Sequence, residues 1–356
     1  MTAVGALESP PVHALHWLRK ALLNPAVSGS LLLALLTAPE HTLAAVLGRL
    51  RLPPTFDLDL VRYILQALLG VGTVRFLNRR LNTISSNGGR LSKAPGWNWP
   101  KELAVVTGGC SGIGQNIVEQ LAERGVTVAI FDVQSLPKSL EGRDNIRYFK
   151  CDVTSPQSVG MMADTVRREL GHPTILVNNA GITSPHSILD MPQETLNKVF
   201  QVNTISHWYM VQQFLPNMVK TNKGHIVTVA SIASFIALAK AADYSATKAS
   251  ALAFHEALNT ELRCIYKANN VLTTIVHPNF VRTPLVAAFV DNLEKAGIKL
   301  LTSEHVASAT TRQIFSQRGA QLVLPDNMSF ISAFRAWPAW AQNLVRRTVG
   351  SSAKDM

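Results

Sequence analysis

Tyr244 and Lys248 stand four positions apart, in a segment that reads Tyr-Ser-Ala-Thr-Lys. A spacing of four places both side chains on one face of a helix. An ammonium beside a phenol favours the phenolate, so we expect Lys248 to lower the pKa of Tyr244 from about 10 toward neutral pH. Such a phenol can exchange a proton with an alcohol or a carbonyl oxygen, which predicts general acid–base catalysis. The alternative is that both are exposed helix residues with no shared role.

A glycine-rich segment begins at residue 107 and reads Thr-Gly-Gly-Cys-Ser-Gly-Ile-Gly. It follows a predicted strand over residues 103–106 and precedes a predicted amphipathic helix. Gly108, Gly112 and Gly114 let the backbone turn tightly and approach a pyrophosphate, while the helix N-terminus offers unpaired N–H groups to the anion. The segment therefore predicts a dinucleotide-binding turn, although a strand-to-helix turn can be rich in glycine for packing alone.

Asp132 ends the next apolar run, eighteen residues after Gly114. An acid at the tip of the second strand can accept hydrogen bonds from the adenosine ribose and repel a 2′-phosphate. The glycine-rich segment contains no lysine or arginine, and Val133-Gln134 follow the acid. These residues favour NAD as the cofactor, although NADP stays possible. The simpler alternative is that Asp132 caps a loop.

The elements that must position these residues follow from the pattern after residue 101. Apolar runs over residues 126–131, 226–230, 271–276 and 321–324 alternate with helical stretches. This alternation predicts βαβ units and an α/β fold with a doubly wound parallel sheet. We place this domain at residues 101–325, preceded by a linker at 82–100 that is rich in Ser, Gly, Asn and Pro.

Further motifs follow the glycine turn in order: Cys151-Asp152-Val153, Asn178-Asn179-Ala180-Gly181, Asn203, Ser231 and Tyr244-Ser245-Ala246-Thr247-Lys248. With them, residues 101–325 resemble the short-chain dehydrogenase/reductase family. The resemblance implies a Rossmann fold of about seven strands. It also implies catalytic roles for Asn203, Ser231, Tyr244 and Lys248. The cofactor-binding residues that it implies are Gly108, Ser111, Gly112, Ile113, Gly114, Asp132, Asp152, Val153, Asn179, Tyr244, Lys248, Val281 and Thr283.

The resemblance also gives each catalytic residue a role. Ser231 is expected to hold the substrate oxygen, and Asn203 to position a water that relays protons to Lys248. The segment Pro278-Asn279-Phe280-Val281 has asparagine where the wider family commonly has glycine. In this it looks closer to the membrane-anchored branch of retinol dehydrogenases and 17β-hydroxysteroid dehydrogenases. An apolar stretch over 284–301 occupies the place of that family's mobile substrate lid, or forms a core-facing helix.

The first 81 residues form a hydrophobic, helical region that we expect to associate with a membrane. Residues 21–39 are nineteen residues without a charge, close to the roughly 20 that a spanning helix needs. A second run over 63–74 has only twelve residues and is expected to be too short to span alone. A bilayer span, a shallow hairpin, an interfacial helix and simple packing on the catalytic domain all stay open.

Each of two aromatic segments can contact either a membrane or another part of the protein. Trp97 and Trp99 either anchor at a membrane interface or cover the start of the catalytic domain. Residues 326–356 form an amphipathic C-terminal extension that carries aromatics and Arg346-Arg347. This extension either faces a membrane or covers the N-terminal helices.

Composition limits the class of protein. The 356 residues carry a net charge of +11 and are 47% hydrophobic, which excludes a disordered polymer. Three scattered cysteines and dispersed histidines predict neither a disulfide scaffold nor a metal site. No nucleic-acid motif occurs, so the basic excess fits anionic lipid better.

We therefore expect an NAD-dependent oxidoreductase that interconverts a lipophilic alcohol, such as a retinoid, a steroid or a long-chain lipid, and its carbonyl. It is expected at a membrane, of the endoplasmic reticulum or a lipid droplet, with a cytosolic catalytic domain, as a homodimer or homotetramer. The alternatives are an NADP-linked carbonyl reductase on the same fold, and a catalytically idle Rossmann protein that serves as a membrane interaction module.

Overall fold

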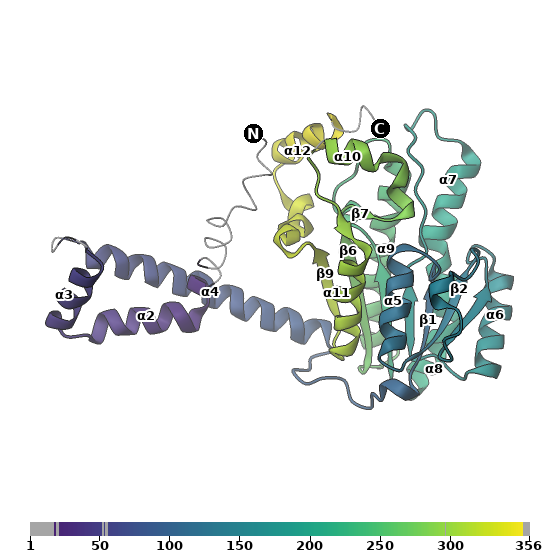
Figure 1. The fold of residues 1–356 in the computed structure, drawn as a ribbon, viewed down its shortest axis with the longest axis horizontal. Coiled ribbons are helices and arrows are strands. Elements are labelled where there is room, and N and C mark those ends of the chain that lie inside the picture. Colours follow the sequence, from purple (N-terminus) through teal and green to yellow (C-terminus); the bar gives the residue numbers. More distant parts are fainter. Residues whose placement is uncertain (1–17, 19–20, 52, 54–55, 296, 352–356) are drawn as a thin grey trace. The chain divides into compact units, whose positions relative to one another are not determined.

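The computed structural model describes residues 18, 21–51, 53, 56–295 and 297–351. Its contacts divide the chain into two compact units, residues 1–85 and residues 86–356 (Figure 1). The first unit contains the helices α2 (Pro25–Thr37), α3 (Glu40–Arg49) and α4 (Leu58–Ser86), the last residue of which falls in the second unit. The two units are described separately below.

The uncharged run over 21–39 does not form one straight helix. The Asn24 side chain accepts a hydrogen bond from the backbone N–H of Ala26 and caps α2, which ends at Thr37. The chain then bends by 120° into α3. Thirteen helical residues extend about 20 Å, less than the roughly 30 Å of a bilayer core.

Helix α4 is long enough to span, which corrects the expectation for residues 63–74. Its 29 residues continue past Arg62 and Arg75, the charges that bounded the predicted run. Arg62 is partly neutralised within this unit, because it donates to Asp59 Oδ1 at 2.8 Å and to the Leu35 carbonyl at 3.1 Å. By length and composition, α4 qualifies as a membrane span among the described residues, and α2 with α3 qualifies only as one broken span.

The second unit is built on a seven-stranded parallel sheet in the order β3-β2-β1-β4-β5-β6-β9. The strands are β1 (Leu103–Thr107), β2 (Thr127–Asp132), β3 (Ile146–Lys150), β4 (Ile175–Asn178), β5 (Gly224–Val229), β6 (Val271–Pro278) and β9 (Ala320–Leu324). The predicted strands and the doubly wound α/β fold are confirmed.

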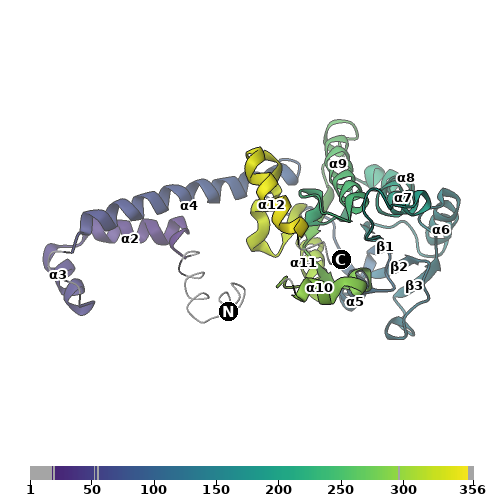
Figure 2. The ribbon, with the colours of Figure 1, turned by 90° about the horizontal axis from the view of Figure 1, so that it is seen from above.

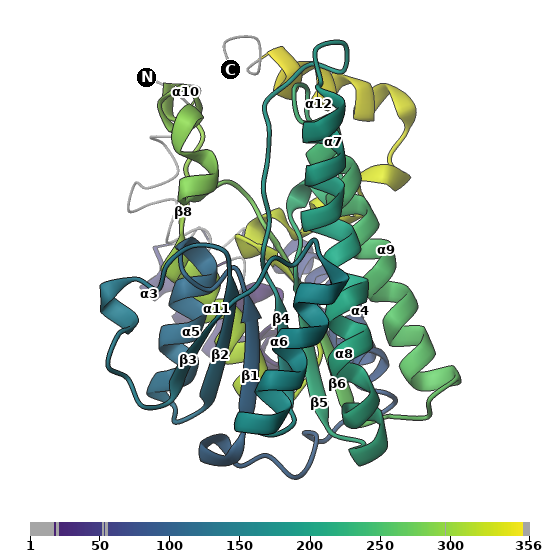
Figure 3. The same ribbon diagram turned by 90° about the vertical axis from the view of Figure 1, so that its right-hand side faces the viewer.

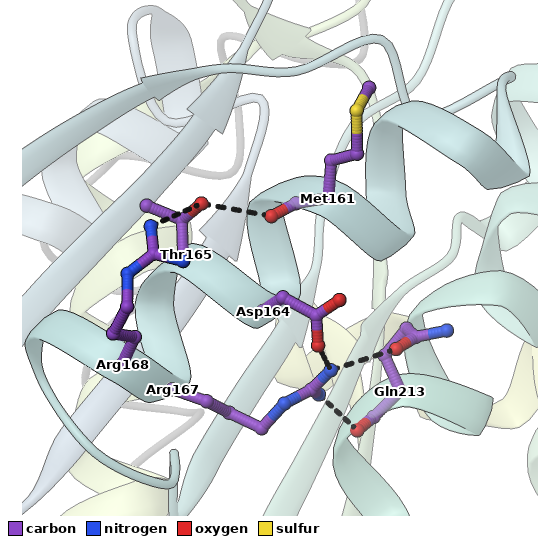
Figure 4. Close-up of polar contacts among 6 residues, drawn as sticks. All are labelled: Met161, Asp164, Thr165, Arg167, Arg168 and Gln213. Carbon is purple, nitrogen blue, oxygen red and sulfur yellow. Dashed lines mark hydrogen bonds and ion pairs between the residues drawn. The ribbon is translucent and has the colours of Figure 1, made fainter.

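Helices cover both faces of this sheet (Figures 2 and 3). On one face α5 (Gly112–Glu123) and α11 (Ser303–Phe315) pack together, and α5 buries Ile117, Val118 and Leu121 against the strands. On the other face lie α6 (Pro156–Glu169), α8 (Ser206–Thr221) and α9 (Ala242–Cys264). Arg167 of α6 reaches across to α8, where it donates to the backbone and side-chain oxygens of Gln213 at 3.0 and 3.3 Å (Figure 4).

Further elements complete the unit. They are η2 (Trp99–Lys101), η3 (Lys138–Leu140), α7 (Gln193–Phe200), η4 (Gln201–Ile205), η5 (Ile232–Ser234), β7 (Val281–Arg282), η6 (Pro284–Phe289), α10 (Val290–Lys295), β8 (Leu301–Thr302), η7 (Asp326–Ala336) and α12 (Ala339–Ser351). Trp97 and Trp99 stack at 5.3 Å, and Trp99 meets Phe315 of α11 edge to face at 4.9 Å. The tryptophan pair therefore covers the start of the second unit.

The segment after α4 is fixed to the amino-terminal edge of the sheet. Asn87 donates to the Gly319 carbonyl at 3.3 Å and accepts from the Gly319 N–H at 2.8 Å. The Ala94 N–H donates to the Gln317 carbonyl at 3.0 Å. Because Gly319 directly precedes β9, the chain enters this unit where its parallel strands begin.

Candidate active site

The glycine turn links β1 to α5 and needs glycine at specific positions. Gly108 and Gly112 have φ of +64° and +56°, in the left-handed region that disfavours a side chain. A Cβ atom at Gly114 would collide with the carbonyl oxygen of Gly108. Asn179 fixes the same turn from the end of β4, because its Nδ2 donates to the Thr107 and Gly108 carbonyls at 3.0 Å.

Asp132 ends β2 beside this turn and is only 6% exposed. Its Oδ2 accepts from the Cys110 N–H and its Oδ1 from the Gln134 N–H, both at 2.9 Å. It also lines the cavity described next. The carboxylate thus stabilises the loop and stands at the place where a ribose is expected.

A cavity of about 930 Å³ lies at the carboxyl ends of the strands. The structure brings most of the predicted site residues to its wall: Gly108, Ser111, Gly112, Ile113, Asp132, Asp152, Val153, Asn179, Ser231, Tyr244, Lys248, Val281 and Thr283. Gly114 and Asn203 are not among the lining residues. Asp152 is exposed, and its Oδ1 accepts from the N–H and the hydroxyl of Thr154.

Tyr244 and Lys248 share one face of α9, as their spacing predicts. The Nζ atom of Lys248 lies 5.5 Å from the centroid of the Tyr244 ring. It donates to the Val229 carbonyl at 3.0 Å, and the side chain is 3% exposed. Ser231 follows β5, caps the turn η5 and hydrogen-bonds to Tyr244. A phenol, an ammonium and a hydroxyl therefore meet at one wall of the cavity.

The expected lowering of the tyrosine pKa is wrong for this structure. Burial raises the pKa of Tyr244 to about 12, and the hydrogen bond to Ser231 offsets only part of that rise. Burial also lowers the pKa of Lys248 to about 8. Desolvation outweighs the proximity of the two groups because it disfavours the charged form of each. At neutral pH the pair is a neutral phenol beside an ammonium.

Asn203 lies behind the cavity in η4, a π-helical turn between α7 and α8. Its Oδ1 accepts from the Ile182 N–H and its Nδ2 donates to the Ile182 carbonyl, both at 2.8 Å. Nδ2 also donates to the Thr247 hydroxyl at 3.1 Å, next to Lys248. The fully buried amide therefore joins the segment after β4 to the helix that carries Tyr244.

Two residues that sequence reasoning missed hold the Ser231 turn. The ring Nδ1 of His277 lies 3.1 Å from the Ser231 carbonyl. Arg335, in the C-terminal extension, donates to the Ser234 and Phe235 carbonyls at 3.1 and 3.3 Å. A guanidinium suits these carbonyls, which end a helical turn. No local pattern marks Arg335, because its partners lie about 100 residues earlier in the chain.

The remaining cavity wall is largely apolar. The aliphatic and aromatic lining residues beyond the glycine turn include Leu238, Phe280, Leu285, Val286, Phe289 and Ile298. Four of them, Leu285, Val286, Phe289 and Ile298, belong to the stretch over 284–301, for which a lid and a core-facing helix were both open, and Leu293 of that stretch is fully buried. Thr348 of α12 also lines the cavity, so the C-terminal extension contributes to the site.

This fold and this constellation match one class of protein. The family model described as short chain dehydrogenase matches residues 102–294, and the chain belongs to that family. As a member of this family, it is an oxidoreductase that uses a nicotinamide dinucleotide.

Particular relatives narrow the comparison. Dehydrogenase RED2 of Cochliobolus heterostrophus is 39% identical over 180 residues, which cover 51% of this chain and 68% of that protein. Epidermal retinol dehydrogenase 2 of Mus musculus is 34% identical over 196 residues, which cover 53% of this chain and 63% of that protein. The chain also resembles a solved structure, that of a short chain dehydrogenase/reductase from Burkholderia phymatum in complex with NAD. The two superpose with a TM-score of 0.60 at 23% identity, over 66% of this chain and 93% of that one. That last likeness supports the fold.

Proposed function

We propose that the protein interconverts a lipophilic alcohol and its carbonyl, with NAD as the preferred cofactor and Tyr244 as the general acid and base. The observation that carries this proposal is the group formed by Tyr244, Lys248 and Ser231 at one wall of an otherwise apolar cavity. A scaffold protein has no need of this buried polar group, which disfavours a catalytically idle role.

The residues divide the proton chemistry among them. Ser231 holds the substrate oxygen by a hydrogen bond, and Tyr244 takes the hydroxyl proton in oxidation or gives one to the carbonyl oxygen in reduction. The ammonium of Lys248 stabilises the phenolate that forms when Tyr244 has lost its proton. A bound nicotinamide dinucleotide would accept or supply the hydride.

The cofactor fits the residues at the other end of the cavity. Because Gly114 has no side chain, the N-terminus of α5 can pack closely against the Gly108 carbonyl, just after β1. This arrangement suits the binding of a pyrophosphate. Asp132 is placed to accept hydrogen bonds from ribose hydroxyls and to repel a 2′-phosphate, and this favours NAD.

A lipophilic substrate follows from the apolar wall and from the relatives. Phe280, Leu285 and Phe289 line the space beyond Tyr244. One relative is named a retinol dehydrogenase. A retinoid, a steroid or a long-chain lipid alcohol satisfies both observations.

One observation favours carbonyl reduction as the second candidate. With its pKa at about 12, Tyr244 keeps its proton at neutral pH and is ready to donate it. An NADP-linked carbonyl reductase would use this state directly. Acceptance of a 2′-phosphate would then require Asp132 to move or be screened.

The test is a screen of the purified full-length protein against retinoids, steroids and fatty alcohols, with NADH or NADPH formation as the readout, and the reverse assay on the matching carbonyls. We expect turnover of apolar alcohols with a higher kcat/KM for NAD. Equal or better turnover with NADP would support the reductase instead. Turnover confined to small polar alcohols would contradict the lipophilic substrate.

For the N-terminal region we propose that residues 1–81 hold the protein on a membrane of the endoplasmic reticulum or a lipid droplet, with α4 as the main anchor and the catalytic domain in the cytosol. Cell fractionation of the full-length chain tests this. Recovery with the cytosolic proteins would contradict it.

A further inference from the structure

A group of arginines lies on the catalytic domain where the chain leaves α4. Arg90 donates from Nε to the Asn87 carbonyl at 3.2 Å. Arg263, at the end of α9, donates from Nη1 to the Ala268 carbonyl at 3.1 Å. Its guanidinium lies against Gly88, where a Cβ atom would be 3.3 Å from its central carbon. Two cationic groups therefore flank one short loop at the amino-terminal edge of the sheet.

Neither guanidinium group forms an ion pair with an acid in the part of the chain that the structure describes. Nη2 of Arg90 and Nε and Nη2 of Arg263 are buried and find no acceptor among the described residues. Burial lowers the pKa of Arg263, and the nearby charge of Arg90 lowers it further. Glu261 is the nearby acid along α9, and it accepts from the Tyr266 hydroxyl. Buried donors of like charge, with no carboxylate between them, form a site that an oxyanion would complete.

The surface around these arginines is amphipathic. Leu91, Ile265 and Tyr266 are 62%, 65% and 42% exposed, and Lys93 and Lys267 stand beside them in sequence. Exposed aliphatic and aromatic side chains among lysines and arginines are typical of a face that rests on a membrane interface. A soluble anion would use the charges but would leave these apolar side chains unexplained.

In sequence, only a short basic segment separates this face from the apolar part of α4. No acid occurs between Asp59 and Glu102, whereas Arg75, Arg79 and Arg80 follow the apolar part of α4. Ser86 lies six residues beyond Arg80, about 9 Å along a helix, which is comparable with the headgroup layer. Residues 87–90 directly follow α4 and include Arg90.

We propose that the face formed by residues 87–93 and 263–267 docks on the membrane and binds the headgroup phosphates of anionic lipids at Arg90 and Arg263. This docking face lies at the edge of the sheet opposite to the cavity. It rests on the proposed membrane anchor but not on the proposed catalysis.

The chain provides its own probe for the test. Cys264 is exposed within the docking face, whereas Cys110 and Cys151 are buried. A fluorophore on Cys264 of the full-length protein is measured in nanodiscs of phosphatidylcholine alone, or with phosphatidylserine, that carry a nitroxide-labelled quencher lipid. We expect quenching in the anionic discs and much less in the neutral discs.

Two pairs of variants separate charge from apolar contact. In the Arg90→Gln/Arg263→Gln variant, the ratio of docked to undocked protein should fall by about fivefold for each arginine. Arg168→Gln is the matched control, because Arg168 is exposed on α6 and should leave quenching unchanged (Figure 4). Since loss of Arg263 can loosen the fold, Ile265→Ser gives a second test at an exposed position, with Leu189→Ser as its control. Ile265→Ser should also reduce quenching.

Three results would overturn the proposal. A label that is unquenched in both discs, with the protein still disc-bound, would refute docking and leave the anchor intact. Quenching that is the same with and without phosphatidylserine, and the same in the native protein and the arginine variant, would refute headgroup recognition. Arginine-dependent stabilisation of the detergent-solubilised protein by inorganic phosphate, without quenching in discs, would assign the site to a soluble anion. Turnover of alcohols by the same samples reports on catalysis separately.

Discussion

At the scale of single residues, the two ends of the cavity differ in how their charges are held. The Asp132 carboxylate accepts two backbone N–H groups and remains available at the cavity wall. At the other end, burial keeps Tyr244 neutral and brings the pKa of Lys248 close to the working range. Cofactor choice and proton transfer therefore depend on separate residues and can be tested separately.

Asp132→Ala should reduce the preference for NAD. Loss of hydrogen bonds to a charged acceptor, together with the lost repulsion of a 2′-phosphate, should lower the NAD/NADP ratio of kcat/KM by about 10- to 100-fold. Steady-state kinetics with both cofactors measure this ratio. Asp152→Ala is the control, because its exposed carboxylate is turned toward Thr154 and should affect both cofactors alike. An unchanged ratio in Asp132→Ala would refute the assigned role.

At the scale of elements, the turn η5 is positioned by parts of the chain that are remote in sequence. Ser231 begins the turn, and His277 of β6 contacts the Ser231 carbonyl. Arg335 of η7 donates to the Ser234 and Phe235 carbonyls at the end of the turn. The Ser234 hydroxyl donates to the Lys248 carbonyl at 2.8 Å and joins the turn to α9. Through Arg335, an extension outside the matched family region supports the proposed catalytic serine.

Arg335→Gln should therefore lower kcat by about 10- to 100-fold, because small displacements of a positioning group are costly. Binding of NADH, measured by fluorescence, should stay unchanged. Arg335→Lys should recover part of the rate, since an ammonium can still donate to one carbonyl. Arg347→Gln, an exposed arginine on α12, is the matched control. Equal kcat values for Arg335→Gln and Arg347→Gln would show that the contact is dispensable.

The elements also show what the sequence could and could not predict. The strands and the glycine turn were predictable because buried parallel strands and their turns leave local patterns, as at residues 103–107 and 108–114. Three features were not. The hydrogen bonds from Arg335 to the end of η5 join residues far apart in sequence. The raised pKa of Tyr244 depends on burial by the whole fold. The length of α4 could not be seen because arginines interrupt its apolar run.

At the scale of the whole molecule, four buried histidines link stability to pH. Burial lowers the pKa of His207, His225 and His255 to about 3, and that of His277 to about 4, from an ordinary value of 6.5. Between these values the unfolded chain binds protons that the folded chain does not. Their contribution to stability is therefore fully present above pH 6.5 and is lost as the pH falls toward 4.

The free energy of unfolding, measured by urea titration of the detergent-solubilised protein, should be nearly constant just above pH 6.5 and should fall steeply below it. His207→Gln should reduce this slope, because one proton-binding group is removed from the unfolded state. His172→Gln, at an exposed position, should keep it. Stability that does not change between pH 6.5 and 4 would contradict this description of the buried histidines.

The most direct test of the central claim compares the native protein with Tyr244→Phe. The initial rate of NADH formation from an apolar alcohol and the dissociation constant of NADH are measured for both proteins. Loss of the phenolic proton carrier should reduce the rate by about 10²- to 10⁴-fold and leave NADH binding unchanged. A Tyr244→Phe variant that oxidises the alcohol at nearly the native rate would contradict the proposed catalytic role of Tyr244.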